Sequence, residues 1–161
     1  MERTRTRLLL WIPVALLPLS NLLGAALSEA AWDMRSALPW ALFAAAEELF
    51  FRWFLLKKLL LDSGEIKTGA AVLLTSAIFS AMHLFNLRTG APAGEVLAQT
   101  VCAFCFSVWA GAAVKRTEQL AVPLLAHVLL NLTACDGVGA IVPLAAHLAV
   151  LLDGIQLIGE T

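Results

Sequence analysis

Long apolar runs, separated by short polar segments, are the dominant pattern along this chain. A helix needs about 20 mostly apolar residues to cross the hydrocarbon core of a bilayer, so runs of this length predict transmembrane helices. The runs show no internal repeat. The pattern therefore predicts an all-α, polytopic transmembrane helical bundle with six spans, at residues 8–27, 37–60, 68–87, 94–114, 120–135 and 138–158.

The two ends of the chain each leave an alternative. Three arginines precede the first run, as in a secretory signal peptide, but the apolar part of a signal peptide is only about 7–15 residues long. We interpret this longer run as a retained transmembrane helix, in which Pro13 and Pro18 predict kinks. Only Asp136-Gly137 separates the last two runs, which form either a tight hairpin of two short helices or one broken helix.

The basic residues are unevenly distributed between the two sides on which the six spans would place the loops. Eight lysines and arginines fall on the side of the N-terminus, whereas only Arg35 and Arg88 fall on the other side. Cytoplasmic loops of membrane proteins are enriched in Lys and Arg. We therefore expect both ends of the chain to be cytoplasmic, in the plasma (inner) membrane of a bacterial or archaeal cell.

Composition supports the same class of protein. Of the 161 residues, 60% are hydrophobic and 14% are charged, whereas soluble domains are roughly 25% charged. This excludes an ordinary soluble domain, and we expect one integral membrane domain over residues 1–161 with a core at 37–135. No basic patch indicates a nucleic-acid partner. We interpret the three cysteines as small apolar helix residues rather than a metal or redox site: Cys102, Cys105 and Cys135.

A few polar residues lie inside the predicted spans, where lipid cannot hydrogen-bond to them. Placing one charge at the bilayer centre costs at least ~2.5–3.5 kcal/mol on insertion scales, so such residues usually serve a function and have a partner within the protein. We expect the whole set to converge on the bundle interior: Glu47, Glu48 and Arg52 in the second span, His83 and Asn86 in the third, His127 and Asn131 in the fifth, and His147 in the last.

Helical spacing sorts these residues into pairs. Glu48 and Arg52 are four residues apart with the acid first, which is the favourable order for an ion pair on one helix face. Glu47 lies about 100° further round the helix and has no partner on its own helix. Two further pairs each share a helix face: Phe79 with His83, and His127 with Asn131.

Counting along the predicted spans gives these residues different depths. Glu47 falls near the middle of the membrane, His83 nearer the outer side and His127 nearer the inner side. Three such depths do not fit one site, so we expect tilted or kinked helices, or span boundaries that differ from the predicted ones.

One unpaired carboxylate, two imidazoles and an amide are sufficient for peptide-bond hydrolysis without a bound metal. A carboxylate in a low-dielectric pocket becomes a better general base. One imidazole can orient the attacking water or pass its proton to the leaving amine. The second imidazole and the amide can donate hydrogen bonds to the oxyanion of the tetrahedral intermediate, where the loss of one donor typically costs about 10²–10³ in rate.

Taken together, three motifs resemble the signature of the CPBP proteins, the CAAX-protease and bacteriocin-processing membrane proteins also called the ABI group. These proteins are glutamate-dependent intramembrane endopeptidases and include the Rce1-type prenyl-protein proteases. The first motif alone would be weak, but all three occur here in the family's order and on apolar spans. The motifs are Glu47-Glu48-x-x-x-Arg52, Phe79-x-x-x-His83 and His127-x-x-x-Asn131.

The resemblance implies four catalytic residues and three supporting ones. The implied assignment is that Glu47 and His83 activate water, His127 and Asn131 form the oxyanion hole, Glu48 and Arg52 lock the site, and Phe79 packs beside it. It implies no cofactor and no metal, and the chain has no His-Glu-x-x-His motif. Two histidines and one glutamate are nevertheless able, in principle, to ligate zinc.

The resemblance implies a membrane-embedded or lipidated protein or peptide as the substrate, within the lipid bilayer. A C-terminal sorting or anchor segment, a CAAX-like terminus and a bacteriocin precursor are all compatible with it. Two other functions fit the same residues. A non-catalytic scaffold or immunity protein would tolerate Glu47→Gln, whereas a protease would not. A small proton-coupled transporter is less favoured, because transporters often contain inverted repeats and none is visible here.

Overall fold

The computed structural model describes residues 2–29, 32–134 and 141–159, and within these ranges it contains helices and no strand. The prediction of an all-α helical bundle is therefore confirmed. The elements in chain order are α1 (Glu2–Ser28), α2 (Met34–Glu48), η1 (Leu49–Leu61), α3 (Thr68–Met82), η2 (His83–Thr89), α4 (Ala93–Thr117), α5 (Ala121–Leu132) and α6 (Ile141–Gly159).

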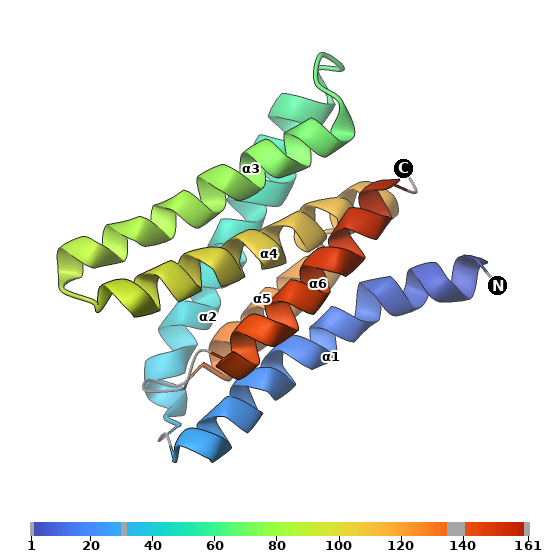
Figure 1. Ribbon diagram of the computed structural model, residues 1–161. Coiled ribbons are helices and arrows are strands. Elements are labelled where there is room, and N and C mark those ends of the chain that lie inside the picture. Colours follow the sequence, from blue (N-terminus) through green and yellow to red (C-terminus); the bar gives the residue numbers. More distant parts are fainter. Residues whose placement is uncertain (1, 30–31, 135–140, 160–161) are drawn as a thin grey trace.

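The helices form a closed ring in which α3 packs on α4, α4 on α6, α6 on α1, α1 on α5, and α5 on α2 (Figure 1). Helix α2 continues directly into η1, which is wound as a π-helix and packs against α3, so the ring closes on itself. Helix α4 also contacts α5 across the ring. The motif-bearing elements α2, η1, α3 and α5 thus line one side of the bundle interior.

Among the described residues, four helical segments are long and apolar enough to cross a membrane: Leu10–Ser28, Thr68–Thr89, Ala93–Thr117 and Ile141–Gly159. The other two predicted spans differ from the predictions for physical reasons. Residues 34–61 form a helix of sufficient length, but Glu47, Glu48 and Arg52 interrupt its apolar stretch. Helix α5 has 12 residues, or about 18 Å, which is shorter than the ~30 Å hydrocarbon core. The predicted count of six spans is therefore approximate.

Side chains from α1 and from the segment between α1 and α2 allow α5 to end early. The last carbonyls of a helix have no partner within it, and lipid supplies none. Here Asn21 Nδ2 donates to the Leu130 carbonyl at 3.0 Å, and Trp32 Nε1 donates to the Leu132 carbonyl at 2.7 Å. The predicted span at 120–135 therefore stops at Leu132, because these donors satisfy the C-terminal carbonyls of the helix.

Helix α1 is continuous through Pro13 and Pro18. Helices α5 and α6 are separate helices on either side of residues 135–140. Asp136-Gly137 and Cys135 lie outside the described residues.

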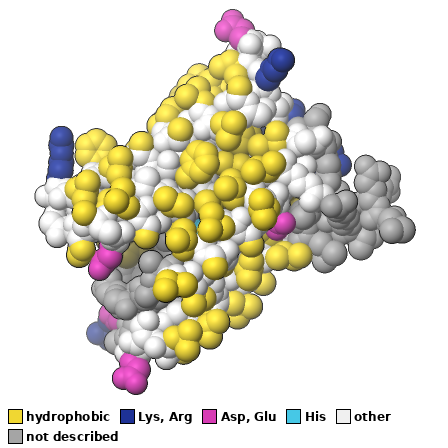
Figure 2. Space-filling view, viewed as in Figure 1, with side chains coloured by type: hydrophobic (Ala, Val, Ile, Leu, Met, Phe, Trp, Pro, Cys, Tyr) yellow, Lys and Arg dark blue, Asp and Glu magenta, His cyan; other side chains and the backbone are white. Residues whose placement is uncertain are grey.

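Large apolar side chains cover much of the outer surface, and charged side chains gather at its extremities (Figure 2). Trp40 is 65% exposed and Leu152 is 68% exposed, although both lie within helices of the bundle. Such extensive apolar exposure is rare on a soluble monomer and suits a lipid-facing surface. Together with the four long apolar helices, it defines an integral membrane protein.

Helices α4 and α6 approach closely at Gly154. A Cβ added there would lie 2.7 Å from the Trp109 Cα atom and 2.8 Å from the Trp109 backbone nitrogen. We expect Gly154→Ala to lower the free energy of unfolding by about 1–3 kcal/mol, because the two backbones would have to separate. Thermal unfolding in detergent measures this effect. Gly94→Ala is the matched control, since no atom lies within 4 Å of an added Cβ there, and equal stability of the two variants would contradict the prediction.

Candidate active site

The junction of α2 and η1 carries a buried ion pair. Glu48 is the last residue of α2, and Arg52 follows within the first π-helical turns of η1. Arg52 Nε lies 3.1 Å from Glu48 Oε2, and both side chains are fully buried. The predicted pairing of these two residues on one helix is thus present, in a place where neither charge has access to solvent.

His127 of α5 joins this pair from across the bundle. Its Nδ1 lies 3.0 Å from Glu48 Oε1, and its Nε2 lies 3.8 Å from Glu47 Oε2. A carboxylate that is already paired with a guanidinium accepts hydrogen bonds and donates none, so Nδ1 carries the proton shared with Glu48. Glu48 therefore holds both Arg52 and His127, one on each carboxylate oxygen, and it orients His127 Nε2 towards Glu47.

Aromatic rings enclose the charged groups. The Phe79 ring lies under the Arg52 guanidinium, with Cζ 5.2 Å from the ring centroid. The same ring is 5.8 Å from the His127 ring and 5.2 Å from the His83 ring. Phe106 of α4 lies 4.7 Å from the His127 ring on another side. These contacts exclude water and lipid from the buried part of the cluster, which strengthens the electrostatic interactions within it.

Phe79 also links His83 to the other motifs. His83 Nδ1 lies 3.1 Å from the Phe79 carbonyl, one turn earlier on the same helix. Since a carbonyl only accepts, the Nδ1–H is the donor and the neutral ring keeps the lone pair of its Nε2. A half-buried imidazole in this tautomer can accept a proton or a hydrogen bond from water at Nε2.

Glu47 is the more accessible of the two adjacent carboxylates. Its side chain is 18% exposed, whereas that of Glu48 is fully buried. Glu47 has no ion-pair partner on its own helix, as predicted from its spacing, and its Oε2 lies 3.8 Å from His127 Nε2. This separation is longer than a direct hydrogen bond, and it leaves the partly exposed Glu47 carboxylate oriented towards the imidazole.

Asn131 follows His127 by one turn on α5 and contacts α2. Its Nδ2 donates to the Trp40 carbonyl at 3.1 Å. An amide nitrogen carries two hydrogens, so one N–H anchors the side chain and the second is available as a donor. The contacts Trp40–Asn131 and Glu48–His127 also show that α2 and α5 pack in antiparallel register along the site.

The different depths predicted for these residues do not prevent them from meeting in the bundle. His83 lies in the C-terminal part of the helical segment 68–89, at the start of η2. His127 lies near the middle of α5. The ring contacts through Phe79 then bring both histidines to one region beside the α2–η1 junction.

The remaining polar residues of the predicted set form hydrogen bonds to other groups. Asn86 Nδ2, in the middle of η2, donates to Gln99 Oε1 at 2.8 Å. His147 is buried, its Nδ1 lies 2.7 Å from the Pro143 carbonyl of its own helix, and it is close enough to His127 to interact with it electrostatically. Cys102 and Cys105 are free thiols on α4. Within the described ranges, no group of three or more His, Cys, Asp or Glu side chains is arranged to hold a metal ion.

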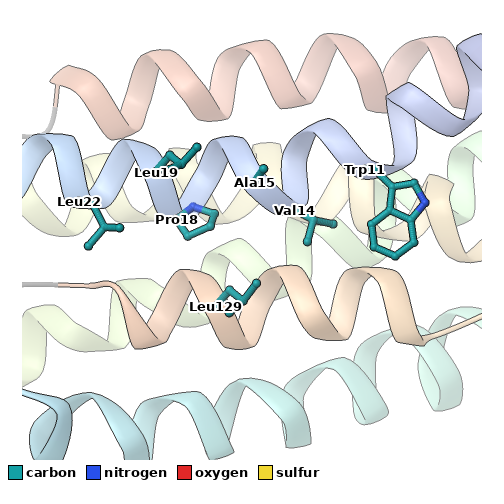
Figure 3. Close-up of a pocket in the computed structure, with 7 residues that line it drawn as sticks. All are labelled: Trp11, Val14, Ala15, Pro18, Leu19, Leu22 and Leu129. Atoms are coloured by element: carbon teal, nitrogen blue, oxygen red, sulfur yellow. The ribbon is translucent and has the colours of Figure 1, made fainter.

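Two parts of the site carried no sequence signal. Phe106 lies in a span without a motif, and only the packing of α4 reveals its contact with His127. The Trp40 carbonyl is a backbone group, so no residue type could have indicated it. An apolar groove of about 490 Å³ lies elsewhere, between α1 and α5, where Trp11, Pro18 and Leu129 line it (Figure 3). None of the predicted site residues contributes to that groove.

The fold and the site define a helical integral membrane protein with a buried acid–imidazole cluster. The model of the type II CAAX prenyl endopeptidase family, Rce1-like, matches residues 30–133. This match covers more than half of the chain and includes all three motifs, and the chain belongs to this family of membrane proteases. No similar protein with a curated description and no similar solved structure was found.

Proposed function

We propose that this protein is an intramembrane endopeptidase that hydrolyses a peptide bond with a water molecule activated by Glu47. The proposal rests mainly on two adjacent carboxylates that lie in different environments. Glu48 is fully buried and bound by Arg52 and His127, while Glu47 is partly exposed and faces His127 Nε2. One carboxylate is thus occupied in holding the site together, and the other is available for proton transfer.

In the proposed reaction, a Glu47 oxygen takes one proton from water while the water oxygen bonds to the scissile carbonyl carbon. The carbonyl π electrons move onto oxygen and form the oxyanion. When the intermediate collapses, the carbon–nitrogen bond breaks and the amine nitrogen receives the proton held by Glu47. The neutral His83 ring, with Nε2 as acceptor, supports the orientation of the attacking water.

The oxyanion is held by His127 and Asn131 in this proposal. Asn131 has one N–H bound to the Trp40 carbonyl and a second one to donate. Since Nδ1–H of His127 is shared with Glu48, a donor at Nε2 requires the doubly protonated ring. With His127 charged, the cluster contains two carboxylates and two cations, which is the balance that a buried set of charges needs.

The family supports a membrane-associated prenylated protein as the class of substrate. Mass spectrometry of synthetic prenylated CAAX peptides, incubated with the purified protein in proteoliposomes, tests this directly. A single new C-terminus, absent with the Glu47→Gln protein, supports the proposal. Peptides that stay intact, alongside cleavage of non-prenylated membrane peptides, would restrict the proposal to another membrane-associated substrate; intact peptides of every kind would contradict it.

Asn131→Ala removes one proposed oxyanion donor. We expect the cleavage rate to fall by about 10²–10³-fold, because a donor aimed at the developing negative charge stabilises the transition state more than the substrate. Initial rates at saturating substrate measure this effect. Asn86→Ala is the control, since that amide binds Gln99 away from the cluster and its loss should leave the rate unchanged. An Asn131→Ala protein that is folded and fully active would remove Asn131 from the mechanism.

We propose that the reaction requires no metal ion. The histidines and glutamates of the cluster bind one another, the Phe79 carbonyl and aromatic rings, which fits hydrogen-bonded roles for these groups. We expect a strong zinc chelator to leave the cleavage rate unchanged, as measured on the purified protein before and after dialysis. Activity that the chelator abolishes and zinc restores would establish the metal-dependent alternative instead.

A further inference from the structure

Three side chains next to the site leave buried polar atoms without a partner. Arg52 Nη1 and Nη2, Ser76 Oγ and Ser107 Oγ are buried and form no hydrogen bond within the part of the chain that the structure describes. All three residues are fully buried. Arg52 binds Glu48 through Nε alone, so most of the donors of its guanidinium are directed elsewhere. A buried donor without a partner destabilises the folded protein, above all when it is charged.

The two serines differ from the other hydroxyl residues of their own helices. A buried hydroxyl on a helix commonly bonds to a carbonyl three or four residues earlier. Thr75 and Ser80 of α3 do so, at 3.0 Å and 3.1 Å, and Thr100 of α4 does so at 2.8 Å. Ser76 and Ser107 do not make this bond. Their hydroxyl groups are therefore available to a partner outside their own backbone.

Helices η1, α3 and α4 pack together about one helical turn away from Arg52, Ser76 and Ser107. A Cβ added at Gly111 of α4 would lie 3.0 Å from Val72 Cγ1 and 3.4 Å from Leu56 Cδ2. Leu56 and Val72 also belong to one packed apolar cluster between these helices. Leu56, Val72 and Gly111 thus form one apolar layer in which the three helices meet.

Arg52, Ser76 and Ser107 each lie four residues, or about one helical turn, from a member of that layer. Helix α3 runs antiparallel to α4 and leads back from the end of η1 (Figure 1). Moving one turn towards the N-terminus in η1 or α4 therefore leads in the same direction along the bundle as moving one turn towards the C-terminus in α3. The three polar residues thus occupy one layer, directly above the apolar one and on the side of the catalytic cluster.

We propose that Arg52, Ser76 and Ser107 form a buried hydration site that binds at least one internal water molecule between η1, α3 and α4. A buried water typically makes about three hydrogen bonds to groups that are otherwise unsatisfied. Both serine hydroxyls and the guanidinium Nη groups supply such partners from three different helices. The water would hold the guanidinium on the side opposite Glu48, and the site does not depend on whether the protein cleaves a peptide.

A high-resolution crystal structure of the wild-type protein in a lipid phase tests the site directly. We expect solvent density within hydrogen-bond distance of an Arg52 Nη atom and of at least one of the two serine hydroxyls. Hydroxyl groups bonded straight to the guanidinium, or turned back to their own helix carbonyls with no solvent between them, would overturn the proposal.

Melting temperatures of alanine variants provide a second test in solution. We expect Ser76→Ala and Ser107→Ala each to lower the melting temperature more than Ser80→Ala, whose hydroxyl bonds to its own helix. The losses should also be non-additive in the double variant, because both hydroxyls bind the same water. Additive losses, or losses no larger than that of Ser80→Ala, would contradict a shared hydration site.

Discussion

Replacing Glu47 with glutamine is expected to reduce peptide cleavage by about 10²–10⁴-fold, the usual contribution of a general base. Glutamine keeps the size and the hydrogen-bonding shape of the side chain but cannot accept the proton of water. The fold should be unaffected, because Glu47 is partly exposed and the buried ion pair belongs to Glu48. Single-turnover cleavage by the purified protein in proteoliposomes measures the effect on the chemical step.

Glu95→Gln is the matched control for this experiment. Glu95 lies exposed in the first turn of α4, away from the cluster, and its substitution should leave the rate unchanged. A Glu47→Gln protein with the wild-type rate would show that another group activates the water. A loss of activity that accompanies unfolding would show that Glu47 is structural.

Replacing Arg52 with methionine is expected to lower the free energy of unfolding by roughly 3–5 kcal/mol, the usual effect of removing one partner of a buried ion pair. Arg52 and Glu48 are both fully buried, so the remaining carboxylate keeps His127 but has no bulk solvent to compensate for the lost guanidinium. Unfolding in mixed detergent, followed by tryptophan fluorescence, measures the loss.

The double variant Glu48→Met/Arg52→Met separates stability from catalysis. Its stability should recover much of the loss, because replacing both members of a buried pair with apolar side chains removes the unpaired charge. Its activity should stay absent, because His127 Nδ1 has lost its acceptor. Lys58→Met is the control at the same spacing: Lys58 pairs with Asp62 at 3.1 Å on the surface, so its loss should change stability by less than about 1 kcal/mol. Equal losses in Arg52→Met and Lys58→Met would contradict this account.

The sequence predicted the contacts that arise within one helix. The ion pair between Glu48 and Arg52 follows from their spacing of four residues, and the ring contact between Phe79 and His83 follows from the same rule. The convergence of the polar residues also follows from physical necessity, since lipid cannot satisfy them. The all-α bundle and the family were likewise accessible from the apolar runs and the three motifs.

Contacts between particular residues of different helices could not be predicted from the sequence. His127 binds Glu48 although 79 positions separate them. Nothing in the spacing of either motif indicated whether His127 would bind Glu47 or Glu48. The apolar run at 120–135 contains no signal for the end of α5, which depends on donors from Asn21 and Trp32 far away in the chain. Phe106 belongs to the site only because α4 packs on α5. Such features depend on how the elements pack, and packing is not encoded in local periodicity.

The central claim is that Glu47 makes this membrane protein a peptidase, and a comparison of protein termini in cells tests it most directly. Source cells would carry either the wild-type protein or Glu47→Gln at equal abundance, and mass spectrometry would identify the termini of their membrane proteins. The account predicts that particular membrane-associated proteins keep an uncleaved terminus only in the mutant cells. Identical termini in both, under conditions where the protein is made, would contradict the account and favour a scaffold or transport function.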